Sequence, residues 1–495
     1  MPGGPLLRIV AYVVVFLVSA AIMGTVRSRS LRQIALLIAS YALYFTWSPW
    51  FAAVLAASTT INYLVGEWLR RKPSGRALWS GIFFNFALLG VFKYLPETAV
   101  HLPFSALHPF ARLVMPLGIS FWTFQALSYL FDVYQGEDID PSLWEFALYM
   151  AFFPVTISGP VCRMTEMLPQ FRSTATTASD DVLLGLRRVA TGVFMMQLAR
   201  LLGQGILAGD GINSGFDRLT RWSGLDVWCL AFGYGLQLFF DFAGYSHIAI
   251  GAARALGFEV PENFSRPFAS TTPSIFWTRW HMSLSFWIRD YVFFPIMQMR
   301  REIWWRNSAL LVSMILFGLW HKASVLFLLW GVYHGVLLVL HRILEAQERK
   351  YDWPPIEAAG SSMLRAWNAL AWVTTISLVS VGWILFRAHS VSQARQMFGA
   401  LVDPTSYRVH FLTASLYVMV AAIAAAYVIT LLTIDALNSA SSHQPATSES
   451  PGFAVLLARS RWFWLAPLYA VALFFLLFVT ISHGTSAAQM MYGNF

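Results

Sequence analysis

Long apolar runs, separated by short polar or basic segments, occupy most of the 495-residue chain. About 20 apolar residues are enough to cross a bilayer as a helix, and the sequence offers about a dozen such candidates. The first run, Leu6 to Thr25, lacks a basic start and a small-residue cleavage site, so we interpret it as a retained span. Later candidates are Arg188 to Leu207, Leu225 to Leu256, Ser308 to Leu340, Ala366 to Phe386, Leu412 to Leu432 and Trp462 to Ile481. The pattern predicts an all-α polytopic membrane protein, a bundle of about 11–13 transmembrane and re-entrant helices in a single domain, residues 1–495.

Basic residues predict the sidedness of these spans. Arginines and one lysine cluster after the first and third spans, which places both clusters in the cytoplasm: Arg27, Arg29, Arg32, Arg70, Arg71, Lys72 and Arg76. The N-terminus and the segment Pro96 to Phe110 should then be external, and Arg163 to Arg188 should be internal. The intervening segment, Trp144 to Gly159, must therefore be re-entrant or packed deep in the protein. Irregular backbone at membrane depth is tolerated only where it is buried or lines a cavity, so a cavity is implied.

Composition narrows the class further. Hydrophobic residues make up 57% of the chain and charged residues 12%, far fewer charges than in soluble domains. The net charge of +9 is explained by cytoplasmic loops, without a nucleic-acid partner. Cys162 and Cys229 have no metal-like spacing, and we expect two buried thiols. The polar link Ser439 to Pro451 should be flexible.

The stretch FWTRWHMSLSFWIRDYVFFP, Phe276 to Pro295, concentrates charged and aromatic residues. As one helix it would carry an aromatic side formed by Phe276, Trp280, Trp287 and Tyr291, with Arg279, Ser283 and Asp290 close together beside it. His281 would face roughly the opposite way. Because adjacent helical residues do not face one another, a pair between Arg289 and Asp290 is not expected. The stretch is either an interfacial amphipathic helix or one that leans into the protein.

A second concentration is LFGLWHKASVLFLLWGVYHG, Leu316 to Gly335. The surrounding apolar region would be about 50 Å long as one helix, against about 30 Å of hydrocarbon, so it must tilt, break or cross twice. His321 and Lys322 fall near its middle, where ionisable residues are costly and often functional. A deep histidine should be neutral and able to act as a general base. The alternative is a histidine held by a backbone carbonyl between packed helices. The other nearby histidines lack a carboxylate or thiolate set, so we expect no metal.

Several separated segments resemble, in order, motifs of the membrane-bound O-acyltransferases, specifically the bacterial branch that contains the alginate O-acetyltransferase membrane subunit. They are GISFWTFQALSYLFDVYQG (Gly118 to Gly136), FFPVTISGPVCRMTEMLPQF (Phe152 to Phe171), FFDFAGYSHIAIGAARALGFEVPENFSRPF (Phe239 to Phe268), Phe276 to Pro295, GLWHKAS (Gly318 to Ser324) and VGWILFRAHS (Val381 to Ser390). The resemblance places the catalytic core at about residues 113–398, followed by additional C-terminal spans at about 399–495. Before Leu113 and after Phe398 the chain matches only in hydropathy.

The resemblance implies helices around a central funnel or tunnel, entered from the cytoplasm by an acyl thioester donor, either acyl-CoA (acetyl-CoA first) or an acyl carrier thioester, with no bound cofactor. It also implies two catalytic histidines, His321 as general base and His281 as a secondary participant. Candidates for contacts with donor or acceptor are Arg163, Asp241, Arg279, Ser283, Arg289, Asp290 and Lys322. Glu262 and Asn263 should brace a loop beside the cavity.

The activity so implied moves an acyl group, in the first place acetyl, to hydroxyls of an extracytoplasmic polysaccharide, from the bacterial cytoplasmic (inner) membrane. A periplasmic or extracellular acetyltransferase partner could finish the transfer. One alternative is D-alanyl transfer to teichoic acid from a carrier protein. Another class is a transporter or channel that uses His321, Lys322 and Asp241. The chain departs from the family at Lys322, where a glycine is common, and at IMQMRREIWWRN, where alginate-type relatives often have a Gly-rich basic loop.

Overall fold

The computed structural model describes residues 5–99, 110–206, 209–350 and 361–442. In these ranges the regular structure is helical, apart from one isolated antiparallel bridge between Phe264 and Trp280. The α-helices are α1 (Pro5–Thr25), α2 (Arg29–Trp47), α3 (Pro49–Arg71), α4 (Gly75–Leu89), α5 (Leu95–Ala99), α6 (Ile119–Gln135), α7 (Leu143–Ala151), α8 (Met164–Arg172), α9 (Ser179–Gln204), α10 (Ile212–Asp217), α11 (Gly224–Ala255), α12 (Pro273–Trp277), α13 (Met282–Ile288), α14 (Phe294–Gln298), α15 (Ile303–His321), α16 (Val325–Lys350), α17 (Ser361–Arg387), α18 (Val391–Val402) and α19 (Ala414–Ser442).

Shorter segments join them: the π-helical turns η1 (Gly90–Tyr94) and η4 (Arg289–Phe293), and the 3-10 turns η3 (Pro267–Ala269) and η6 (Pro404–Arg408). Seven helices in the described ranges are long and apolar enough to cross a membrane: Gly75–Tyr94, Ser179–Gln204, Gly224–Ala255, Ile303–His321, Val325–Lys350, Ser362–Arg387 and Ala414–Ala436. The prediction of an all-α polytopic membrane protein is confirmed. The predicted span Trp462 to Ile481 and most of the polar link lie outside the described residues.

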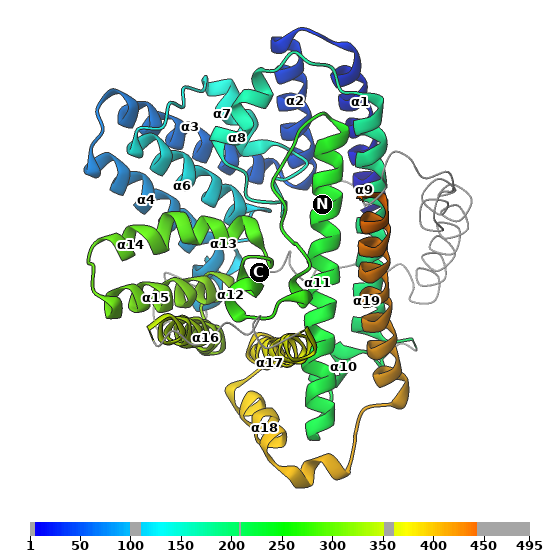
Figure 1. Cartoon of the computed structure of the whole chain (residues 1–495). Helices are drawn as coiled ribbons and strands as arrows, with labels where there is room; N and C mark the ends of the chain where they lie inside the picture. Colours follow the sequence, from blue (N-terminus) through cyan, green and yellow to red (C-terminus); the bar gives the residue numbers. More distant parts are fainter. Residues whose placement is uncertain (1–4, 100–109, 207–208, 351–360, 443–495) are drawn as a thin grey trace. The chain divides into compact units, whose positions relative to one another are not determined.

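The chain divides into two compact units, and the division falls within α9, α11 and α17. The first unit contains residues up to 193 and residues 242–382. In it, α6 packs between α3 and α4, while α7 packs on α2 and α3 (Figure 1). The second unit contains residues 194–241 and, within the described ranges, 383–442. There, the Asp226 carboxylate accepts backbone N–H bonds from Ser223 and Leu412, which fastens the start of α11 to the segment before α19.

The segment predicted to be re-entrant or packed deep is indeed irregular and buried. Helix α7 has only nine residues, and from Glu145 to Thr156 the side chains are buried. The chain then continues in turns to Gly159 and in extended form to the start of α8. Two hydrogen bonds of ordinary length stabilise this stretch. The Tyr149 hydroxyl donates to the Cys162 carbonyl oxygen at 2.9 Å, and the Phe153 N–H donates to Ser40 Oγ at 3.2 Å.

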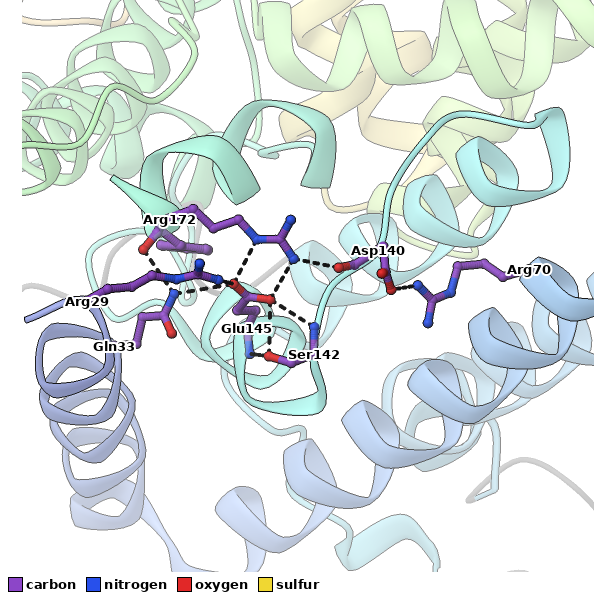
Figure 2. Close-up of polar contacts among 8 residues, drawn as sticks. Arg29, Gln33, Arg70, Asp140, Ser142, Glu145 and Arg172 are labelled. Carbon is purple, nitrogen blue, oxygen red and sulfur yellow. Dashed lines mark hydrogen bonds and ion pairs between the residues drawn. The ribbon is translucent and has the colours of Figure 1, made fainter. Parts of the chain in front are cut away.

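A buried carboxylate fastens α2, α7 and α8 together. Glu145 forms a capping box with Ser142 at the start of α7. Its carboxylate also accepts from Arg29 of α2 and from Arg172 of α8, with Arg172 Nε and Nη2 at 2.9 and 3.0 Å from the two oxygens (Figure 2). Burial by itself would raise the pKa of Glu145, but these donors outweigh it and lower the pKa to about 2.

The long apolar region Ser308 to Leu340 was expected to tilt, to break or to cross the membrane twice. In the structure it is broken into two helices. Helix α15 ends at His321, a short turn follows, and α16 begins at Val325. The two helices form a closely packed hairpin. A Cβ on Gly318 would lie 2.3 Å from the Phe327 carbonyl oxygen, and one on Gly331 would lie 2.5 Å from that of Met314. Only glycine permits backbones to approach this closely.

The two cysteines and the segment Pro96 to Phe110 differ in part from expectation. Cys162 is buried as predicted, but Cys229 is only partly buried. The segment expected to be an external loop, Pro96 to Phe110, begins within the short helix α5, and residues 100–109 lie outside the described residues.

Candidate active site

His321 is the last residue of α15 and is 4% exposed. Its imidazole stacks on Phe317, with ring centroids 5.2 Å apart, and meets the edge of Trp330 at 5.8 Å. Trp320 and Phe327 contribute two further rings, with centroids 4.7 and 6.1 Å from that of the imidazole. The histidine therefore lies in an aromatic box built from both helices of the hairpin. Such surroundings favour the neutral imidazole, which can accept a proton.

The end of α15 is completed by another element. Lys93 of η1 donates from Nζ to the Trp320 carbonyl oxygen, and this ammonium lies 4.7 Å from the centre of the Trp320 ring. Tyr94 donates from Oη to the carbonyl oxygens of Leu319 and Trp320, at 3.2 and 3.3 Å. Helix ends leave their last carbonyls without intrahelical donors, and these two side chains supply them. Sequence reasoning missed Lys93, although a lysine within an apolar run was a usable signal.

His281 lies between α12 and α13 and is 1% exposed. Its backbone is left-handed, with φ of 45°. On each side of it the main chain is held by the segment that follows α11: the Ser265 N–H donates to the Arg279 carbonyl at 3.0 Å, and the Met282 N–H donates to the Asn263 carbonyl at 2.9 Å. This pairing maintains a conformation that non-glycine residues rarely adopt.

A polar network surrounds the ring of His281. Its Nδ1 lies 3.3 Å from Asn263 Oδ1, and the same oxygen accepts from Ser283 Oγ at 2.6 Å. Asn263 also donates from Nδ2 to Ser246 Oγ of α11 at 3.0 Å. On the other side, the edge of Phe242 packs against the imidazole with centroids 4.6 Å apart. Both His281 and Lys93 lie within electrostatic range of His321.

The stretch from Phe276 to Pro295 is therefore not the single helix that we predicted. The left-handed His281 separates α12 from α13, and η4 then widens the helix into a π turn. The aromatic side survives only as two pairs, Phe276 stacked on Trp280 at 5.5 Å and Trp287 against Tyr291 at 5.3 Å. The three polar residues predicted to lie together have separate partners: the Ala269 carbonyl for Arg279, Asn263 for Ser283, and Arg163 for Asp290.

Arg163 and Asp290 form an ion pair at the end of the buried irregular segment, and Arg163 also lies over the Tyr291 ring, 5.2 Å from its centre. Contrary to expectation, Arg289 pairs with Asp290 as well, with Nε 2.7 Å from Oδ1. The spacing rule concerns the direction of the Cβ atoms, whereas a long arginine can fold back along the helix to its neighbour. Burial would raise the pKa of Asp290, but its bonds from Arg289 and Arg163 hold it below the usual range.

The remaining candidates lie elsewhere. Lys322 caps α15 and is exposed, so it lies beside His321 in sequence but outside the aromatic box. Arg279 is half-buried. Asp241 is buried and belongs to the second unit, and Glu262 pairs with Arg188. Within the described ranges, no group of three or more His, Cys, Asp or Glu residues is arranged to hold a metal ion.

The structure thus defines a class of protein. It is a helical membrane protein in which two buried histidines lie at helix ends among aromatic rings. Residues 31–355 match the family model described as MBOAT, membrane-bound O-acyltransferase family. The chain belongs to this family and is an acyltransferase. The match begins at residue 31, well before the first motif quoted above, which begins at Gly118. A transporter or channel function is not retained.

Curated relatives agree with this assignment. The chain is 34% identical to the probable alginate O-acetylase of Pseudomonas putida over 387 residues, which covers 75% of this chain and 74% of the relative. It is 29% identical to the peptidoglycan O-acetyltransferase of Helicobacter pylori, covering 74% and 73% of the two chains. It is 31% identical to the teichoic acid D-alanyltransferase of Bacillus subtilis, covering 56% of this chain and 70% of that one.

Proposed function

We propose that this protein transfers an acetyl group from a cytoplasmic thioester donor to hydroxyls of an extracytoplasmic polysaccharide, in the bacterial cytoplasmic membrane. The observation that carries the proposal is the burial of His321 in the aromatic box, next to His281. The long, similar coverage of the two O-acetyl-transferring relatives supports acetyl as the group moved.

In the proposed reaction, one nitrogen of the His321 imidazole accepts the proton of the acceptor hydroxyl. The hydroxyl oxygen then attacks the thioester carbonyl carbon, and the C–S bond breaks as the ester C–O bond is completed. The thiolate takes this proton from the His321 imidazolium and leaves as the free thiol, which returns His321 to its neutral form. His281 holds or orients one of the two substrates. The aromatic box excludes water, which would otherwise hydrolyse the thioester.

The donor would approach along the polar cluster of Arg163, Arg289 and Asp290, whose arginines can bind phosphate oxygens as forks. A periplasmic or extracellular acetyltransferase could take over the acyl group and complete the modification of the polysaccharide. The second candidate function is D-alanyl transfer from a carrier protein, favoured by the likeness to the teichoic acid D-alanyltransferase.

Donor turnover distinguishes the two functions. Purified wild-type protein in detergent would be given labelled acetyl-CoA, or a D-alanyl carrier protein, with a polysaccharide fraction or a teichoic acid fraction. The proposal predicts label on the polysaccharide from acetyl-CoA and none on teichoic acid from the carrier. Label from the carrier alone would establish the second candidate and contradict the first.

A further inference from the structure

Three polar side chains around His281, those of Asn263, Ser283 and Ser246, are connected in a way that fixes which ring nitrogen carries hydrogen. We infer that Asn263 is a positioning residue that holds His281 with hydrogen on Nδ1 and presents Nε2 as the proton-exchanging nitrogen. The relevance of this arrangement to acyl transfer rests on the proposed function of His281. The arrangement itself follows from hydrogen-bond directions.

The first direction is set by the backbone. The Val161 N–H points at Ser283 Oγ at a distance of 3.0 Å. A backbone N–H can only donate, so the Ser283 hydroxyl uses a lone pair there. Its own hydrogen is then available for its other partner, which is Asn263 Oδ1 at 2.6 Å. Val161 belongs to the buried irregular segment, so the network begins from backbone that is itself fixed by packing.

The second direction is that of the Asn263 amide. The atom that faces Ser283 and His281 is the carbonyl oxygen Oδ1, which accepts from the Ser283 hydroxyl. The amide nitrogen accordingly faces Ser246 Oγ, to which it donates at 3.0 Å. Reversing the amide would place a second N–H donor, besides that of Val161, against Ser283 Oγ, and the Ser283 hydroxyl hydrogen would lose the acceptor Oδ1. The side chain is 0% exposed, so water cannot compensate for such a reversal.

The ring nitrogen follows from the amide. A carbonyl oxygen can only accept, so the contact of 3.3 Å between Asn263 Oδ1 and His281 Nδ1 requires hydrogen on Nδ1. This holds whether the imidazole is neutral or charged. The nitrogen that can gain or lose a proton is then Nε2, on the opposite edge of the ring. In the neutral ring, the tautomer is set by the bond that the other nitrogen makes.

Asn263 also fixes the position of the ring through its main chain. Its carbonyl accepts from the Met282 N–H at 2.9 Å, and the adjacent Phe264 pairs with Trp280. One residue thus holds both the left-handed backbone of His281 and its side chain. The side chain of Asn263 can be changed without removing the backbone bond, which makes the inference testable.

The test compares Asn263→Leu with Asn263→Asp in the full-length protein. Leucine has a similar size but accepts no hydrogen bond, whereas aspartate keeps an acceptor for Nδ1 and for Ser283. Asn62→Leu is the matched control, because Asn62 is an equally buried asparagine that bonds to Asn85 between α3 and α4. Thermal unfolding in detergent would confirm that each variant is folded.

The first readout does not depend on activity. Nitrogen NMR spectra of histidine-labelled protein in membranes, assigned by comparison with His281→Ala, report which ring nitrogen is protonated. We expect hydrogen on Nδ1 in wild type, Asn62→Leu and Asn263→Asp, and a changed signal in Asn263→Leu. Hydrogen on Nε2 alone in wild type would overturn the inference. A His281 signal that is the same in Asn263→Leu as in wild type would also overturn the inference. If Asn263→Leu does not fold, the Asn263→Asp variant decides, because loss of its Nδ1–H signal would contradict the inference.

The second readout is the rate of acyl transfer. Correctly placed acid–base groups contribute about 10²–10⁴-fold, so Asn263→Leu should lower kcat by about 100-fold, with a smaller change in KM. Asn263→Asp should recover most of this loss, and Asn62→Leu should stay close to wild type. Equal losses in Asn263→Leu and Asn62→Leu would indicate a merely structural role. If wild-type protein turns over neither donor, the proposed function fails while the NMR comparison still decides the inference.

Discussion

His321 ends a helix whose last turn is held from outside. The Trp320 carbonyl accepts from Lys93 and Tyr94, and the Leu319 carbonyl accepts from Tyr94. A cation near a helix C-terminus also interacts favourably with the helix dipole. Lys93 therefore fixes the position of the proposed base.

Replacing Lys93 by methionine should release the last turn of α15. We expect kcat to fall about tenfold, because a buried carbonyl loses a charged donor, a change of about 1.5–3 kcal/mol when the bond is fully lost. Lys93→Arg, which keeps a donor, should retain more activity. The measurement is initial-rate acyl transfer with thermal stability in detergent, and Lys72→Met, at an exposed position after α3, is the control. Equal rates in Lys93→Met and wild type would contradict this account.

At this scale the sequence led to the two histidines that we propose as catalytic, but not to the residues that hold them. His281 and His321 could be named because they fall in motifs of a family with two histidine positions. Asn263 was expected only to brace a loop, because its contacts with Ser246 and Ser283 join residues that are 17 and 20 positions away. Local periodicity carries no information on such pairings.

At the scale of elements, the hairpin of α15 and α16 depends on close backbone approach. Gly318 lies one turn before His321 and faces the backbone of α16, where the Phe327 carbonyl leaves no space for a Cβ. Any residue larger than glycine must separate the two helices. The aromatic box, which draws rings from both helices, would change with them.

Gly318→Ala should therefore lower both stability and activity. Overpacking against backbone costs about 1–3 kcal/mol, so the unfolding temperature in detergent should decrease and acyl transfer with it. Gly399→Ala is the matched control: Gly399 is exposed in α18 with no atom in the way of a Cβ, so it should gain about 0.5–1 kcal/mol from helix propensity. Identical unfolding temperatures for the two variants would show that the close approach is unimportant.

The elements show where sequence reasoning succeeds and where it fails. The length of Ser308 to Leu340 correctly implied that one straight helix was impossible, since helix length and bilayer thickness are fixed quantities. The break at His281 was missed. Nothing in the residue types around it terminates a helix, and the left-handed backbone is held by hydrogen bonds to Asn263 and Ser265, which are distant in sequence.

At the scale of the whole molecule, one buried carboxylate joins several helices of the first unit. Glu145 receives hydrogen bonds from α2, α8 and its own helix cap (Figure 2). Its pKa of about 2, against an ordinary value of 4.5, means that the folded protein prefers the ionised form more strongly than the unfolded chain does. The resulting stability is present above about pH 4.5 and is lost as the pH falls toward 2.

Glu145→Gln should remove this contribution. At neutral pH we expect the variant to be less stable by about 1–3 kcal/mol, since the charged donors Arg29 and Arg172 lose an anionic acceptor and one of its two oxygens. Between pH 4.5 and pH 2, the range over which this contribution is lost, wild type should lose thermal stability more steeply than the variant. Unfolding temperatures in detergent across this range are the measurement. Parallel curves for the two proteins would contradict the assignment.

The central claim is that His321 is the base of an acyl transfer. The most direct measurement is transfer of label from acetyl-CoA to a polysaccharide fraction by purified wild type, His321→Ala and His334→Ala. His334 is a matched control because it is a second buried histidine of the same hairpin, in contact with Trp330 as His321 is. The account predicts that folded His321→Ala loses transfer while folded His334→Ala retains it. Transfer by His321→Ala at the wild-type rate would contradict the claim.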